Sequence, residues 1–188
     1  MLVSNTMSKL IFFSGGVEST ALLNDADPME DVLVTVLPTF PRDIVTSKLQ
    51  SAQAIAERFG FTVNYAQIQV PVEPDPYNFV HQLASFVAVA HLWVVKDSSI
   101  TEIWAGRNSA EVPVVHDPLN FKTQQLAAWN FMHPTIPFVH PLQHLTKIQH
   151  WQSIPLDVRP MVSSCVTYNN CGKCYKCQEV QKLIIQHA

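Results

Sequence analysis

Two groups of residues near opposite ends of the 188-residue chain have types and spacings that could do chemistry. Near the N-terminus, Ser14-Gly-Gly-Val-Glu-Ser-Thr20 directly follows an apolar run of strand length. Glycines at such a turn let backbone N–H groups approach an anion, and a helix start adds the positive end of its dipole. The hydroxyls of Ser14, Ser19 and Thr20 would lie beside a bound phosphate. The alternative interpretation is an ordinary tight turn with a helix cap, where serine and glycine are common.

The second group contains all four cysteines of the chain, Cys165, Cys171, Cys174 and Cys177. Two-residue gaps let a chain wrap around one ion, and four thiolates complete a closed tetrahedral zinc site. A closed site has no open position for a substrate, so we expect zinc to hold the C-terminus in place rather than to catalyse. An iron–sulfur cluster is the alternative metal group. The histidines at positions 133, 140, 144 and 150 share no ligand spacing, and we expect them on the surface or in the core.

The pattern of apolar residues predicts the elements that must position both groups. Apolar runs at residues 10–13, 32–37 and 61–70 predict strands, and residues 18–23 and 44–59 predict helices, the second closed by Gly60. The order strand, helix, strand, helix, strand opens a doubly wound, mostly parallel α/β fold. Farther along, we expect helices at residues 77–95, 121–132 and 146–151, a strand at 100–105 and a short extended segment at 138–142. The proline-rich residues 71–76 predict a loop on the ligand side.

The composition is that of a globular protein, with 47% hydrophobic residues, 14% charged residues and a net charge of −3. This charge gives no general nucleic-acid signature. The sequence contains neither an apolar stretch of the roughly 18 residues that a membrane span needs nor a signal-peptide pattern at its start. We therefore expect a cytoplasmic protein, in which cysteines bind metal more often than they form disulfides.

Taken together, the motifs resemble those of a known superfamily. Residues 14–20 resemble the S-G-G-x-D-S-T pyrophosphate loop of the PP-loop ATP pyrophosphatases. Ser164-Cys165, followed by Cys171-Gly-Lys-Cys174-Tyr-Lys-Cys177, resembles the zinc knuckle of the 7-cyano-7-deazaguanine synthases within that superfamily. The segment at residues 141–148, Pro-Leu-Gln-His-Leu-Thr-Lys-Ile, is similar to the P-L-x-x-L-T-K segment of the same family. The resemblance implies a Rossmann-like, HUP-like nucleotide-binding domain at residues 1–160, with the zinc knuckle and a C-terminal helix at residues 161–188 packed on it.

The resemblance also implies an activity. Such enzymes are ATP-dependent ligases of queuosine biosynthesis that adenylate the carboxylate of 7-carboxy-7-deazaguanine and release pyrophosphate. Ammonia then displaces AMP to give an amide, and a second activation and dehydration give the nitrile. The implied cofactors are ATP, Mg2+ and structural Zn2+, and a homodimer is plausible from the family and from the apolar helix at residues 77–95, although a buried core helix explains that stretch equally well.

The same resemblance assigns roles to individual residues. Ser14, Glu18, Ser19 and Lys147 would be catalytic, the lysine by adding positive charge near the phosphates or the acyl-adenylate. Main-chain groups of Leu37 would lie beside adenine. The nucleotide would be held by Ser14, Gly15, Gly16, Val17, Glu18, Ser19, Thr20, Leu37 and Gly106.

The chain departs from the family pattern in the loop carboxylate, which bears on magnesium and phosphate geometry, and in the middle segments, which lie on the base-recognition side. Glu18 stands where the family has aspartate, residues 106–111 match the family's G-x-N-x-x-D only loosely, and the Pro-Gly-Arg-Asn segment before the long helix is missing. Two alternatives therefore stay open. One is a PP-loop adenylating enzyme that acts on another acceptor, such as a modified base or a protein. The other is an inactive nucleotide-binding and zinc-binding module.

Overall fold

The computed structural model describes residues 7–38, 42–68, 78–106, 121–164 and 171–186. In these ranges, five parallel strands form one sheet in the order β3-β2-β1-β4-β5. The strands are β1 (Ser8–Phe12), β2 (Val32–Pro38), β3 (Val63–Ile68), β4 (Ile100–Ala105) and β5 (Phe138–Val139). The helices are α1 (Val17–Ala21), α2 (Arg42–Arg58), α3 (Asn78–Lys96), α4 (Phe121–Met132), α5 (Lys147–Ser153) and α6 (Tyr175–Gln186), with short 3-10 turns η1 (Leu22–Asp25) and η2 (Arg159–Met161).

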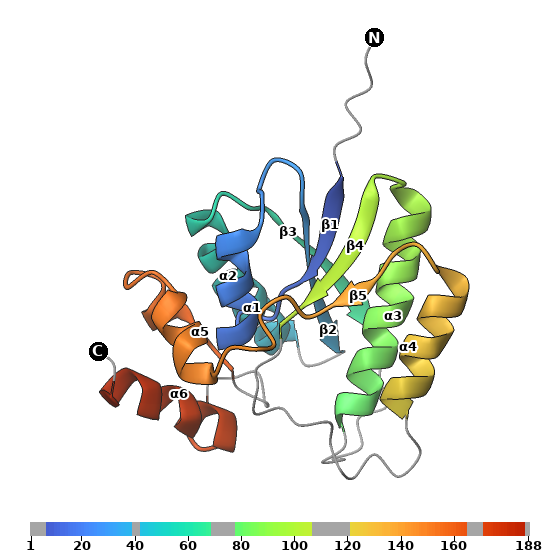
Figure 1. Ribbon diagram of the computed structural model, residues 1–188. Coiled ribbons are helices and arrows are strands. Elements are labelled where there is room, and N and C mark those ends of the chain that lie inside the picture. Colours follow the sequence, from blue (N-terminus) through green and yellow to red (C-terminus); the bar gives the residue numbers. More distant parts are fainter. Residues whose placement is uncertain (1–6, 39–41, 69–77, 107–120, 165–170, 187–188) are drawn as a thin grey trace.

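Helices cover both faces of the sheet, as Figure 1 shows: α1, α2 and α5 lie on one side and α3 and α4 on the other. Successive residues of β1 point to opposite faces. Ile11 therefore packs into the core beneath α1 and α2, whereas Leu10 and Phe12 pack into the core beneath α3 and α4. Burial on both faces explains why β1 reads as a continuous apolar run. The predicted doubly wound α/β fold is confirmed.

The strand order reverses direction at β1. The chain builds β1, β2 and β3 outward on one side and then places β4 and β5 on the other. In doubly wound sheets, ligands bind in the crevice at the carboxyl ends of the strands on either side of such a switch point. The 14–20 loop follows β1 directly, and Gly106 follows β4. Both therefore lie where this architecture places a ligand.

Most predicted elements occur with shifts of one to three residues at their ends. Gly60 closes α2 as predicted, with a φ of +82°. The helix expected at residues 18–23 is shorter, because α1 gives way to η1 after Ala21, whose carbonyl accepts a hydrogen bond of 3.1 Å from the Asn24 side chain. Of the extended segment expected at 138–142, only Phe138–Val139 pairs with the sheet. Residues 71–76 lie outside the described ranges, within which no helix is both long and apolar enough to cross a membrane.

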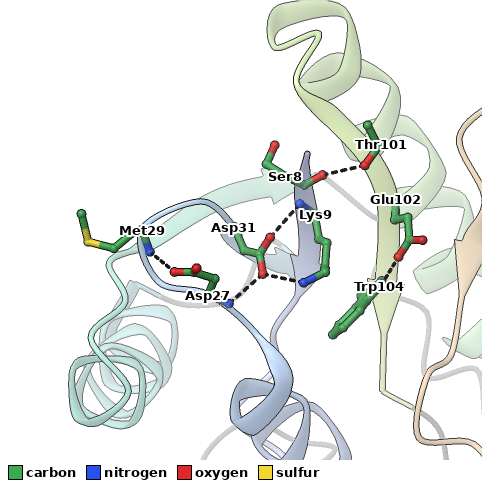
Figure 2. A network of polar contacts seen from close by, with 8 residues as sticks. All are labelled: Ser8, Lys9, Asp27, Met29, Asp31, Thr101, Glu102 and Trp104. Carbon is green, nitrogen blue, oxygen red and sulfur yellow. Dashed lines mark hydrogen bonds and ion pairs between the residues drawn. The ribbon is translucent and has the colours of Figure 1, made fainter. Parts of the chain in front are cut away.

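A polar network joins the amino ends of β1 and β2 (Figure 2). The Asp31 carboxylate accepts hydrogen bonds from the backbone N–H groups of Lys9 and Asp27, both at 2.8 Å, and lies 3.2 Å from Lys9 Nζ. The Asp31 side chain is only 1% exposed. The Lys9 ammonium also lies 4.5 Å from the centre of the Trp104 ring, whose N–H donates to Glu102. The network therefore links β1, β2 and β4 at the end of the sheet opposite the 14–20 loop.

Candidate functional site

The glycine turn at residues 14–16 joins the end of β1 to the start of α1. Gly15 has a φ of +71°, a left-handed conformation that glycine adopts without a steric penalty. Gly16 is the residue that precedes α1, and its carbonyl accepts the first helical hydrogen bond from Thr20 N–H at 2.9 Å. The base of the turn is fixed by Thr35, whose hydroxyl donates to the Phe13 carbonyl at 2.7 Å. The backbone of the turn is therefore closely defined.

Serine hydroxyls point toward the amides of this turn. Ser14 N–H donates to Ser19 Oγ at 3.2 Å, and Gly16 N–H donates to Ser14 Oγ at 3.3 Å. The two hydroxyls lie 3.0 Å apart, and Ser19 also donates to the Gly16 carbonyl at 3.3 Å. Amide and hydroxyl donors concentrated at one turn can bind an oxyanion. Of the predicted site residues, Ser14, Gly16 and Ser19 are thus brought together.

Two other residues of the 14–20 loop have side chains in the core. Val17 and Thr20 are both fully buried, and Val17 belongs to the core beneath α1 and α2. In the described part of the chain, Thr20 Oγ1 has no hydrogen-bond partner. The predicted contact of the Thr20 hydroxyl with a phosphate remains a prediction. Val17 reaches the turn through its backbone N–H.

Gly106 lies against the start of α1. A Cβ atom on Gly106 would lie 2.7 Å from Ser19 N and 2.8 Å from the carbonyl carbon of Glu18. Only a residue without a side chain allows the end of β4 to approach the loop backbone this closely. Gly106 therefore borders the 14–20 loop, and its predicted contact with the nucleotide remains a prediction. Leu37 lies near the carboxyl end of β2, in register with Gln67 of β3, and its predicted position beside adenine remains untested.

Lys147 joins the site from a distant part of the chain. It is the first residue of α5, whose start is fixed by a capping box between Thr146 and Gln149. Its Nζ lies 3.4 Å from Glu18 Oε1 and 2.7 Å from Glu179 Oε2 on α6. Burial by itself would lower the pKa of Lys147, but the carboxylates of Glu18 and Glu179 outweigh it and hold the pKa above its ordinary value. The ammonium therefore stays charged beside the 14–20 loop.

Four residues that support the turn or Lys147 receive no role from the sequence patterns. Lys48 of α2 is buried and donates from Nζ to the Ser163 carbonyl at 2.9 Å, while Ser163 N–H donates to the Gly15 carbonyl at 2.9 Å. The other two are Ser164, which accepts a hydrogen bond from Val17 N–H, and Glu179, which accepts one from Lys147 Nζ. The burial of Lys48 could be predicted from the sequence, because this lysine lies four residues before Ala52 and so on the apolar stripe of the helix.

Three of the predicted metal ligands lie together and are named here the cysteine cluster: Cys171, Cys174 and Cys177. Their sulfur atoms are within 4.8 Å of one another. Backbone N–H groups of Cys174 and Cys177 donate to Cys171 Sγ and Cys174 Sγ at 3.3 Å and 3.4 Å. Zn–S bonds of about 2.3 Å in a tetrahedron place sulfurs about 3.8 Å apart, so the cluster suits zinc. Cys165 lies outside the described residues.

The cysteine cluster leads directly into α6, which packs on the main body of the protein. Val180 and Leu183 of this helix are buried in the core beneath α1 and α2. The helix also carries Glu179, which contacts Lys147. A metal at the cluster would therefore hold one end of a helix whose Glu179 pairs with Lys147, which in turn pairs with Glu18 of the 14–20 loop. The predicted division at residue 160 remains a prediction.

The histidines have separate surroundings. His150 is fully buried in α5, His144 is exposed, and His140 donates from Nδ1 to the Ala105 carbonyl at 2.8 Å. His91 Nδ1 and His133 Nε2 lie 2.9 Å apart and share a hydrogen bond. Burial and the neighbouring His91 hold the pKa of His133 below its ordinary value. In the described ranges, the cysteine cluster is the one group of three or more side chains that could bind a metal.

No protein-family model matches the chain, and no curated protein matches it. Among solved structures, the chain is similar to a 4-thiouridine synthetase in complex with RNA and bound ATP, at 15% identity over 95% of this chain and 50% of that chain, with a TM-score of 0.49. The chain thus spans half the length of that protein. It is also similar to a universal stress family protein from Burkholderia pseudomallei, at 15% identity over 73% of this chain and 96% of that chain, with a TM-score of 0.36. Likeness this weak carries no information about function, which has to be inferred from the site itself.

Proposed function

We propose that this chain is an ATP-dependent adenylating enzyme of the PP-loop type, whose 14–20 loop holds the pyrophosphate of ATP. The observation that carries the proposal is the meeting of the Ser14 and Ser19 hydroxyls at a glycine turn beside the switch point of the sheet, with the Lys147 ammonium 3.4 Å from Glu18 of the same loop. Amides, hydroxyls and an ammonium are the groups that bind phosphate oxygens. The doubly wound sheet supplies the crevice in which such ligands bind.

In the proposed reaction, a carboxylate oxygen of the substrate attacks the α-phosphorus of ATP and pyrophosphate leaves. Negative charge develops on the leaving pyrophosphate, and fixed donors aimed at that charge lower the barrier. Ser14 and Ser19 hydroxyls and the Gly16 amide would make these bonds, and Lys147 would add a positive charge. Magnesium, when bound, neutralises phosphate charge; Glu18 is the carboxylate that the loop itself offers for it.

The substrate that we propose is 7-carboxy-7-deazaguanine, on the strength of the sequence motifs at both ends of the chain. Ammonia would attack the carbonyl carbon of the acyl-adenylate and AMP would leave, giving the amide. A second activation at the amide oxygen, followed by loss of AMP and protons, would give the nitrile of 7-cyano-7-deazaguanine. Zinc held by Cys165 and the cysteine cluster would have a structural role, fixing α6 and with it the Glu179 contact to Lys147.

The test is a reconstituted reaction. The full chain is incubated with Mg-ATP, ammonium salt and 7-carboxy-7-deazaguanine, and AMP, pyrophosphate and the product masses are measured. We expect AMP and pyrophosphate in equal amounts, dependent on the carboxylate, and at least about tenfold less of both with Ser19→Ala. AMP formation with a different carboxylate would favour another acceptor.

A negative result also distinguishes the alternatives. Binding of ATP without AMP formation from any carboxylate tested would identify a nucleotide-binding module that does not catalyse. Absence of ATP binding in a calorimetric titration would contradict both the enzyme and the module.

A further inference from the structure

We infer that Ser164 is a further phosphate-binding residue of the 14–20 loop, contributed by the segment that precedes the cysteine cluster. The inference rests on the proposed function, in which Ser164 has no part. Val17 N–H donates to Ser164 Oγ at 3.4 Å. A Cβ atom on Gly16 would lie 3.0 Å from the same oxygen. The Ser164 hydroxyl thus lies directly against the Gly16–Val17 backbone.

The position of Ser164 is fixed by the preceding residue, Ser163, whose N–H and carbonyl groups are both hydrogen-bonded. Ser163 N–H donates to the Gly15 carbonyl, and the Ser163 carbonyl accepts from the buried Lys48 ammonium, each at 2.9 Å. Burying an ammonium is costly without acceptors, so this hydrogen bond resists opening. The segment at residues 163–164 is therefore anchored to α2 and to the glycine turn at once. This anchoring places the Ser164 hydroxyl against the loop.

The chemistry of Ser164 matches that of the two serines already assigned to the loop. The backbone N–H groups of Ser14, Gly16 and Val17 each donate to a serine hydroxyl, on Ser19, Ser14 and Ser164, at 3.2, 3.3 and 3.4 Å. These distances exceed the usual N–H···O distance of about 2.9–3.0 Å. A phosphate oxygen is a stronger acceptor that forms shorter bonds of about 2.7–2.9 Å, so it would replace the hydroxyls.

Replacement leaves each hydroxyl beside the anion as a donor. Among the described residues, Ser164 accepts the Val17 bond and donates none of its own. Its proton is therefore available for a phosphate oxygen, as a rotating hydroxyl suits. Ser164 would supply a third hydroxyl to the 14–20 loop, beside those of Ser14 and Ser19.

The test compares Ser164→Ala, Ser164→Thr and the control Ser153→Ala in the full chain. Ser153 also carries a hydrogen-bonded hydroxyl, which donates to the His150 carbonyl at the far end of α5. Each protein is titrated calorimetrically with Mg-ATP and with Mg-pyrophosphate, and its zinc content is measured. We expect Ser164→Ala to bind both ligands about tenfold more weakly, as loss of a hydrogen bond to a charged group requires. Ser164→Thr keeps the hydroxyl and should bind within about threefold of the wild type, and Ser153→Ala should be unchanged.

The outcomes separate this inference from the function on which it rests. Wild-type protein that binds neither ligand overturns the proposed function and the inference with it. Wild-type binding with undiminished affinity in Ser164→Ala overturns the inference alone. So does equal weakening in the alanine and threonine variants, or weakening that zinc saturation reverses. If the alanine variant does not fold, the amide resonance of Val17 in wild-type protein decides, because Mg-pyrophosphate has to shift it; no shift overturns the inference.

Discussion

Substitution of Gly106 by alanine tests how closely the end of β4 packs on the 14–20 loop. The added Cβ would lie 2.7 Å from Ser19 N and 2.8 Å from the Glu18 carbonyl carbon, both backbone atoms. Ordinary van der Waals contact begins at 3.4 Å, so the loop or β4 has to move by about 0.7 Å. Backbone cannot rotate away as a side-chain end can. We therefore expect Gly106→Ala to displace residues that the proposed function needs.

Gly106→Ala should lower both the free energy of unfolding and the affinity for Mg-ATP. Overpacking a fitted contact typically costs about 1–3 kcal/mol, so the free energy of unfolding should fall by about 2 kcal/mol. A displacement approaching 1 Å at a site can cost about 100-fold in function, so the affinity for Mg-ATP should fall by at least about tenfold. The fall in stability is measured by urea denaturation, as a lower midpoint at an unchanged slope. The fall in affinity is measured by calorimetric titration.

The matched control is Gly60→Ala, at the end of α2. Gly60 has a φ of +82°, so alanine there is strained and should lower the free energy of unfolding by about 1 kcal/mol. The control should leave ATP affinity unchanged, because a Cβ on Gly60 meets only Pro28 at 3.4 Å. Wild-type stability and wild-type affinity in Gly106→Ala would refute the close approach of β4 to the loop.

Three further predictions concern other parts of the molecule. The variant Asp31→Ala leaves the Lys9 and Asp27 amides without their acceptor and should lower the free energy of unfolding by about 3 kcal/mol in urea denaturation. The affinity for ATP should not change. An unchanged denaturation midpoint would contradict the stabilising role of the network in Figure 2. The pKa of His133 is lower in the folded protein than in the unfolded chain, so the unfolded chain binds a proton more readily and the free energy of unfolding should fall as the pH drops below 6.5. The variant His133→Gln removes the repulsion with His91 and should reduce this loss between about pH 7.5 and about pH 5.5. A pH dependence identical to that of the wild type would contradict this prediction. Elemental analysis should find about one zinc ion per chain, and chelation should lower the unfolding temperature; iron with visible absorbance would show a different metal group at the cysteine cluster.

Local patterns were sufficient to predict the helices, strands and fold class. The strand at the start of the chain reads as an uninterrupted apolar run because both of its faces are buried, and Gly60 marks a helix end because its φ is positive. The strand order was not predictable in this way. It depends on which distant strands pair, such as β1 with β4, and no periodicity within a strand records its partner.

The candidate site was predictable where its residues are contiguous. The 14–20 loop and the cysteine cluster are short motifs with fixed spacing, so they can be found in one sequence. The contact of Ser164 with Val17 and that of Glu179 with Lys147 could not be predicted, because they depend on how the C-terminal segment folds back onto α1 and α5. Lys48 is intermediate, since a lysine on a buried helical stripe is unusual but does not reveal its acceptor.

The central claim is that the amides and hydroxyls of the 14–20 loop hold the pyrophosphate of ATP. A crystal structure of the full chain with Mg2+ and a non-hydrolysable ATP analogue tests it most directly. We expect β- and γ-phosphate oxygens within hydrogen-bond distance of Gly16 N–H and of the Ser14 and Ser19 hydroxyls, with the Lys147 ammonium beside them. An analogue bound elsewhere, or a 14–20 loop with every serine still donating and accepting as in the present structure, would contradict it.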